Sequence, residues 1–140
     1  MTSFLPLGSV AGKGGGGTPP DVTPGAVNWG NISGVDEASN SGQTISDITS
    51  FITLRATFSG VSGDATGTIV PNVAGVEGTG ATVSEGGSFS FVVSNGQSVY
   101  FTARAAGTAL QARNCTVTIT NSSDGGATLD TFTSAVTVGA

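Results

Sequence analysis

The sequence contains no histidine and only one cysteine, Cys115. Histidine is the usual general base near neutral pH and the commonest zinc ligand, so its absence excludes the most frequent acid–base and zinc sites. A single cysteine forms neither an internal disulfide nor a paired-cysteine metal site, and it fits a chain made in a reducing cytoplasm. These absences predict a protein that is not an enzyme and that carries no cofactor and no metal.

Charge is also scarce, because charged residues make up 9% of the chain and the formal net charge is −5. The four basic residues are Lys13, Arg55, Arg104 and Arg113, which are too scattered to neutralise a row of phosphates. No run of about 18 apolar residues occurs that could span a membrane. The opening apolar stretch has no basic residue before it and is broken by Pro6 and Gly8, so it is a poor secretory signal. We expect neither a nucleic-acid nor a membrane partner.

Carboxylates are the remaining groups that could support chemistry. A pair of them about 5–10 Å apart can cleave a glycosidic bond, and clusters bind calcium. Most of those in this chain lie in turn-like contexts, where a carboxylate ordinarily accepts backbone N–H bonds. They are Asp36, Glu37, Asp47, Asp64, Glu77, Glu85, Asp124 and Asp130. We predict no catalytic or metal site among them. A calcium site at the Asp36–Glu37 loop is the alternative, although no segment has the twelve-residue calcium-loop pattern.

Glycine, by contrast, is abundant, with 23 in 140 residues, and it is concentrated near the N-terminus. Six of the ten residues from Gly8 to Gly17 are glycine, and prolines follow at positions 19, 20 and 24. We therefore predict an extended N-terminal arm over residues 1–24, able to reach roughly 80 Å at about 3.3 Å per residue, and one folded domain over residues 25–140. Phe4, Leu5 and Leu7 have no core of their own and are the predicted assembly contacts. The alternative is a disordered tail or linker.

From residue 25 onward, apolar and polar residues alternate in short runs, the pattern of strands with one buried face. In the clearest run, the apolar residues are Ile52, Leu54, Ala56 and Phe58. Three more runs share this period: Phe89, Phe91 and Val93; Val99, Phe101 and Ala103; and Cys115, Val117 and Ile119. Weaker strand candidates lie near residues 27–29, 43–45, 67–70 and 81–84. The spacing places Cys115 in the core as a small buried hydrophobe.

Turn residues separate these runs. Asn95-Gly96 suits a type I′ turn and predicts an antiparallel hairpin between the strands on either side of it. Glu85-Gly86-Gly87 and the segment Ser123–Gly126 predict two further hairpins. A change of parity between Leu129 and Phe132 predicts a β-bulge in the last strand. The chain is thus expected to be all-β, a single antiparallel immunoglobulin-like β-sandwich of about seven to nine strands. With so few charges, its edges are poorly guarded against strand addition.

Aromatic side chains offer one further kind of site, a platform for a sugar ring. The candidates are Trp29 and Tyr100, since Tyr100 alternates with apolar residues and is expected to face outward from its strand. The competing interpretation of Trp29 is that it packs over an edge of the sandwich. We keep both residues as possible surface-binding aromatics.

Four segments together resemble small immunoglobulin-like proteins of tailed bacteriophages. They are NWGNISG at 28–34, QTISDITSFITLRATFSG at 43–60, SNGQSVYFTARA at 94–105 and TVTITNSSDGGATLDTFTSAV at 116–136. The resemblance implies a non-enzymatic virion accessory protein, made in the bacterial host cytoplasm and present in many symmetric copies or as a homo-oligomer. It favours a capsid decoration or cement protein that contacts the major capsid protein. A tail, collar or fibre component is the alternative, and a host-glycan-binding module is another.

Overall fold

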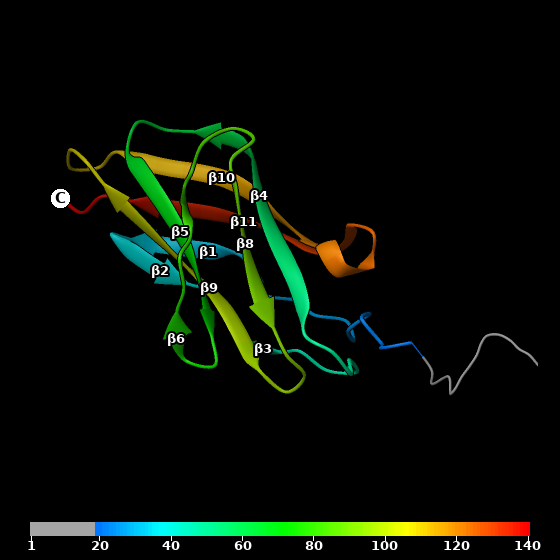
Figure 1. Cartoon of the computed structure of the whole chain (residues 1–140). Coiled ribbons are helices and arrows are strands. Elements are labelled where there is room, and N and C mark those ends of the chain that lie inside the picture. The colour runs from blue at the N-terminus through cyan, green and yellow to red at the C-terminus, as the bar shows by residue number, and fades with distance from the viewer. Residues whose placement is uncertain (1–18) are drawn as a thin grey trace, which may run out of the picture.

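The computed structural model describes residues 19–140. These residues form two β-sheets packed face to face (Figure 1). Sheet A contains, in spatial order, β1 (Ile32–Val35), β11 (Ala127–Thr137), β10 (Ala112–Asn121), β4 (Ile52–Ser62) and β8 (Ser88–Val93). Sheet B contains β2 (Glu37–Ser39), β9 (Ser98–Ala106), β5 (Thr66–Val73) and β6 (Val76–Glu77); β3 (Gln43–Thr44) also pairs with β9, and β7 (Ala81–Thr82) with β5. The predicted immunoglobulin-like β-sandwich is confirmed.

The structure has more strands than predicted because several are only two or three residues long. β3, β6 and β7 have two residues each and β2 has three. The candidates at 43–45, 67–70 and 81–84 coincide with β3, β5 and β7, whereas residues 27–29 belong to no strand. A one-turn 3-10 helix, η1 (Ser122–Asp124), lies between β10 and β11. None of the described residues forms a helix long enough to cross a membrane.

The core lies between the sheets and is built from the alternating runs. In β4, Ile52, Leu54, Ala56 and Phe58 are all fully buried. The inward residues of β8, β9 and β10 meet them, and Phe101 of β9 lies near the centre. Cys115 is among the buried residues, as expected. The period-2 pattern therefore identifies which face of each long strand is buried.

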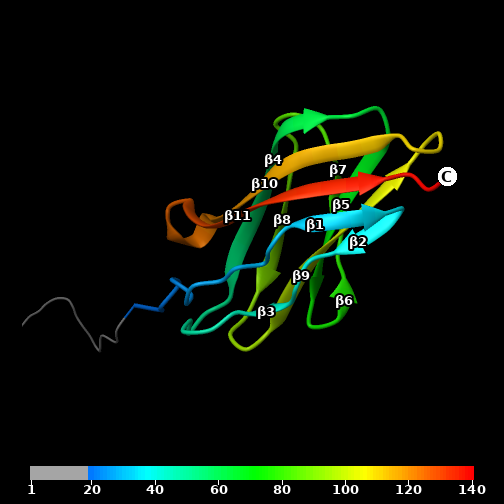
Figure 2. The same cartoon turned by 180° about the vertical axis from the view of Figure 1, so that it is seen from behind.

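β11 contains the bulge that the change of parity predicted. Its pairing with β10 shifts register where Ile119 opposes Asp130 and Thr120 opposes Thr128, which leaves Leu129 as the extra residue. Beyond the bulge, Phe132 and Val136 point into the core. The other side of β11 pairs in parallel with β1, which lies along it in Figure 2.

The turn at Asn95-Gly96 does not form the predicted hairpin. Gln97 N–H donates to Ser94 O, and only Gly96 has a positive φ, as in a type II rather than a type I′ turn. β8 pairs with β4 in sheet A, whereas β9 lies in sheet B. The chain crosses from one sheet to the other here, because Phe91 and Phe101 pack against each other across the core. The prediction of a β8–β9 pair was wrong.

The Glu85–Gly87 turn also joins different sheets, since β7 pairs with β5 and β8 pairs with β4. That hairpin prediction was wrong for the same reason. The hairpin around Ser123–Gly126 is confirmed, because β10 and β11 pair antiparallel around η1. Another tight hairpin was not predicted: β5 and β6 are joined by Ala74 and Gly75, both with positive φ.

Candidate functional site

The described acidic residues do not converge on a catalytic or metal-binding centre. No three Asp, Glu or Cys side chains within residues 19–140 lie close enough together to hold a metal ion. At the Asp36–Glu37 loop, Asp36 Oδ1 accepts a hydrogen bond from Gly139 N–H at 2.8 Å, and Glu37 pairs with Arg104. Both carboxylates are thus engaged with protein groups, and the calcium alternative gains no support.

Cys115 is unsuited to act as a nucleophile. It is 5% exposed and its thiol lies in a small hollow with Val83, Ala103 and Arg113. Burial raises the pKa of the Cys115 thiol to about 11, with a smaller lowering influence from the Arg113 charge. The thiolate is the reactive species, so this cysteine is inert at neutral pH.

Trp29 is a core residue and not a surface-binding aromatic. It is 1% exposed, its ring packs edge-on to Phe101 at 5.2 Å, and its Nε1–H donates to Val99 O at 2.7 Å. Its backbone N–H donates to Asp130 Oδ2 at 2.9 Å. The indole is drawn inward because the interior offers both an apolar pocket and an acceptor. The burial of Trp29 agrees with the competing interpretation, in which the indole packs against the sandwich, and contradicts a sugar contact there.

Tyr100 lies half-exposed on the outer face of sheet B, in line with its expected direction. It opposes Asn72 in the pairing of β9 with β5. Trp29 and Tyr100 therefore belong to different environments and do not form one platform.

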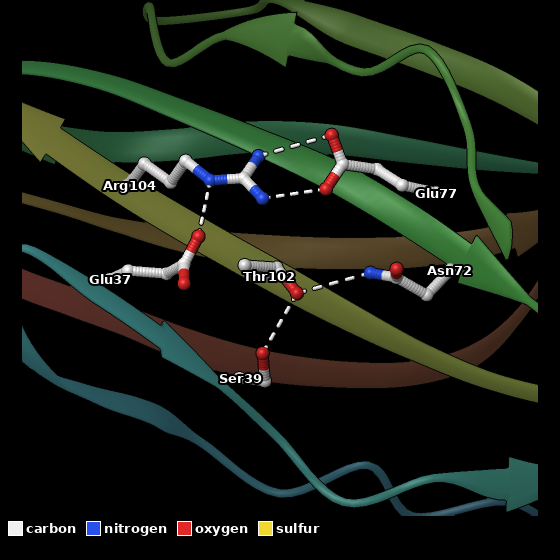
Figure 3. Close-up of polar contacts among 6 residues, drawn as sticks. All are labelled: Glu37, Ser39, Asn72, Glu77, Thr102 and Arg104. Carbon is white, nitrogen blue, oxygen red and sulfur yellow. Dashed lines mark hydrogen bonds and ion pairs between the residues drawn. The ribbon is translucent and has the colours of Figure 1, made fainter. Parts of the chain in front are cut away.

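The outer face of sheet B carries a connected set of polar side chains, the Arg104 cluster (Figure 3). Its members come from four strands and are Glu37, Ser39, Asn72, Glu77, Thr102 and Arg104. Arg104 Nε–H donates to Glu37, while its two terminal nitrogens donate to Glu77 at 2.6 and 3.3 Å. Beneath them, Thr102 Oγ1 accepts from Asn72 Nδ2 at 3.0 Å and bonds with Ser39 Oγ at 2.8 Å.

This cluster holds the sheet together instead of offering a reactive group. The hydrogen bond from Arg104 lowers the pKa of Glu77 below its ordinary value of 4.5, and the two carboxylates raise the pKa of Arg104. Glu77 therefore stays ionised at neutral pH, and both carboxylates are bound to the guanidinium. Since Glu37 lies on β2 and Glu77 on β6, the guanidinium fastens both neighbours of the β9–β5 pair. The cluster was not predicted from the sequence, because its members are far apart along the chain.

The N-terminal end of the described chain forms a second feature, the arm root, Asp21–Gly25. Asp21 O accepts from Thr49 N–H at 3.0 Å, and Gly25 N–H donates to Ser46 O at 3.1 Å. On the other side, Val22 O accepts from the amide of buried Asn121 at 2.8 Å.

Beside the arm root lies an open cleft of about 160 Å³ that is also lined by Asp124 and Leu129. The sandwich thus makes contacts as far back as Asp21, four residues before the predicted start of the domain. The predicted contacts Phe4, Leu5 and Leu7 lie outside the described residues.

The third feature is an apolar patch beside an open sheet edge. β8 is the last strand of sheet A. Val92 within β8 is 53% exposed, and Phe51, which directly precedes β4, is 64% exposed. Val92 opposes Thr53 in the pairing of β8 with β4. Phe51 lies two residues before Thr53, so its side chain is on the same face of the sheet as that of Val92. Both side chains are therefore available to a strand or side chain that packs beside β8.

Comparison with known proteins identifies no family for this chain. No family model and no curated protein matches it. Among solved structures, the N-terminal domain of PorA aligns with a TM-score of 0.43 and 10% identity over 81% of this chain and 92% of that one. CfaE, the adhesive subunit of CFA/I fimbria of enterotoxigenic Escherichia coli, aligns with a TM-score of 0.39 and 10% identity over 79% of this chain and 46% of that one.

Proposed function

We propose that this chain is a non-enzymatic structural protein of a tailed-phage virion, a capsid decoration or cement protein anchored to neighbouring subunits by its N-terminal arm. The observation that carries the proposal is the arm root. Its hydrogen bonds reach the loop before β4 on one side and β10 on the other, so the arm leaves from a fixed point on the sandwich. Because the arm root is bonded to the sandwich, attachment of the arm to another subunit would also hold the sandwich in place.

The described part of the sandwich has the features of a rigid structural domain more than those of a catalytic site. The described carboxylates are engaged or dispersed, Cys115 is inert, and the Arg104 cluster holds strands together. Weak arm contacts would be multiplied when many copies bind a symmetric shell or ring. A host-glycan module is less well supported, because burial of Trp29 leaves Tyr100 as the single remaining aromatic candidate.

The location within the particle is tested by quantitative mass spectrometry of purified virions from a lysate in which this chain is produced. One copy for each shell subunit is the expected result. A few copies per particle would point to the tail, collar or fibre, and absence of the chain from the virion would overturn the proposal.

The anchoring role is tested in the same virions with the full-length triple variant Phe4→Ser, Leu5→Ser and Leu7→Ser. Because these residues are the predicted contacts, the variant should fold normally but fail to join the particle. Val10→Ser is the matched control, since it removes an apolar residue of the same arm that has no predicted contact. Normal incorporation of the triple variant would refute the anchoring role.

A further inference from the structure

The outer edge of β8 presents unpaired backbone groups. Phe58 N–H donates to Gly87 O at 2.9 Å, so Gly87 occupies a hydrogen-bonded position opposite β4. In an antiparallel pair these positions alternate, so Phe89, Phe91 and Val93 bond to β4. The N–H and C=O groups of Ser88, Ser90 and Val92 therefore point away from the sheet, where no described strand lies.

This edge lacks the features that normally protect a sheet from strand addition. β8 has six residues, with no charged side chain, proline or bulge. The opposite edge of sheet A, β1, has four residues and turns at Asp36 into β2. In sheet B, β2 carries Glu37, and the β6–β7 edge is interrupted between Glu77 and Ala81. β8 is the one long unguarded edge in the described part of the chain.

The surroundings of this edge favour a largely apolar partner strand, and among the described residues the one charged group that hydrogen-bonds to β8 is the Arg55 guanidinium, which donates to Ser88 Oγ at 2.9 Å. Val92 is exposed on the outer face and Phe91 is half-buried on the inner face, so a strand added alongside would meet apolar side chains on both. The edge also lies close to the place where the arm begins. Asp21 bonds to Thr49, two residues before Phe51, and Ile48 N–H donates to the side chain of Asn95 just beyond β8.

We propose that residues 3–7 of a neighbouring copy of this chain add to the free edge of β8 as an extra strand. The inference rests on the proposed function, because it names the surface on which the arm anchors. The first twelve residues contain no charged side chain, so none of them would be repelled by the Arg55 guanidinium that lies beside Ser88 of β8. The 14 steps from Leu7 to Asp21 span roughly 46 Å at about 3.3 Å each, enough to reach an adjacent sandwich.

Pro6 fixes which side of the arm faces β8. Proline has no N–H, and successive residues of a strand direct their backbone groups to opposite sides. Ser3, Leu5 and Leu7 therefore bond to β8, while Pro6 faces away from it. Leu5→Pro should weaken binding about fivefold or more through the lost hydrogen bond, whereas Pro6→Ala should leave binding unchanged. An equal effect of the two substitutions would overturn this arrangement.

The edge itself is tested by amide hydrogen exchange of the full chain at increasing protein concentration. When nine-tenths of the edges are occupied, exchange at Ser88, Ser90 and Val92 should slow about tenfold. Ser90→Pro should abolish that protection and the association of the chain, because the ring removes a free-edge donor. Ser90→Ala keeps the donor and should behave as the wild type. Protected amides at Phe89, Phe91 and Val93 in the Ser90→Pro chain will show that the β4–β8 pair is intact.

Two exchange results would overturn the inference. One is free exchange at Ser88, Ser90 and Val92 under conditions in which the chain is associated. The other is concentration-independent protection in a monomer, which would place the arm on its own β8.

Virion incorporation separates this inference from the proposed function. If Ser90→Pro joins virions normally while the arm triple variant does not, the arm binds another virion protein: the inference fails and the proposed function stands. If the wild-type chain is absent from virions, the proposed function fails, whatever exchange shows at β8.

Discussion

Replacing Trp29 with phenylalanine removes a buried N–H donor while keeping an aromatic ring beside Phe101. The Val99 oxygen then loses a hydrogen bond of 2.7 Å inside the core, which costs about 1–3 kcal/mol. The space left by the smaller ring adds roughly 1 kcal/mol. We therefore expect a loss of about 2–4 kcal/mol in the free energy of unfolding, or about 8–16 °C in Tm for a domain of this size.

Thermal unfolding followed by circular dichroism measures this loss, because the variant has no tryptophan left for fluorescence. Tyr100→Phe is the control, since Tyr100 lies half-exposed outside the core, and it should change stability by less than about 0.5 kcal/mol. If Trp29→Phe is as mild as the control, the indole is not an integral part of the core and the reasoning fails. In the wild type, fluorescence from the single Trp29 should resist quenching by acrylamide until the chain unfolds.

Three further predictions concern other parts of the sandwich. Ala74 is exposed with a φ of 52°, so Ala74→Asn should raise stability by about 0.5–1 kcal/mol in denaturant titrations, while Ala127→Asn in an ordinary strand position should not. Arg104→Gln should destabilise the protein at neutral pH, because Glu37 and Glu77 lose their ion pairs. The pKa of Glu77 is lowered on folding, so the difference in stability from the wild type should shrink as the pH falls below 4.5 through that lowered pKa. The difference should also shrink at high salt, which screens the ion pairs. Cys115 should resist alkylation at pH 8 until the chain unfolds, and rapid labelling of the native protein would contradict its burial.

The sequence predicted which face of each long strand is buried, but it did not predict which strands pair with each other. Alternation placed Leu54, Phe58 and Val117 correctly in the core because burial acts on each strand separately. The Asn95-Gly96 signal was local as well, and a turn occurs there. Which sheet the next strand joins is decided by packing across the core, here Phe91 against Phe101, and no local signal encodes that choice.

The environment of a candidate residue could be predicted only where it depended on the pattern of neighbouring residues along its own strand. Placement of Cys115 in the core followed from parity, whereas the role of Trp29 depended on the Val99 carbonyl, 70 residues away. The Arg104 cluster joins residues from four strands, and a single sequence does not show which strands are neighbours. The unguarded edge of β8 likewise emerges only when the strand order is known.

The parallel pairing of β1 with β11 has a practical consequence for display. The arm root lies at the end of the sandwich that carries Thr49 and Asn121, whereas the chain leaves β11 at the other end, next to Gln111 (Figures 1 and 2). A polypeptide fused after Ala140 would therefore project away from the arm root. The domain could carry an enzyme or an antigen outward without obstructing its own attachment.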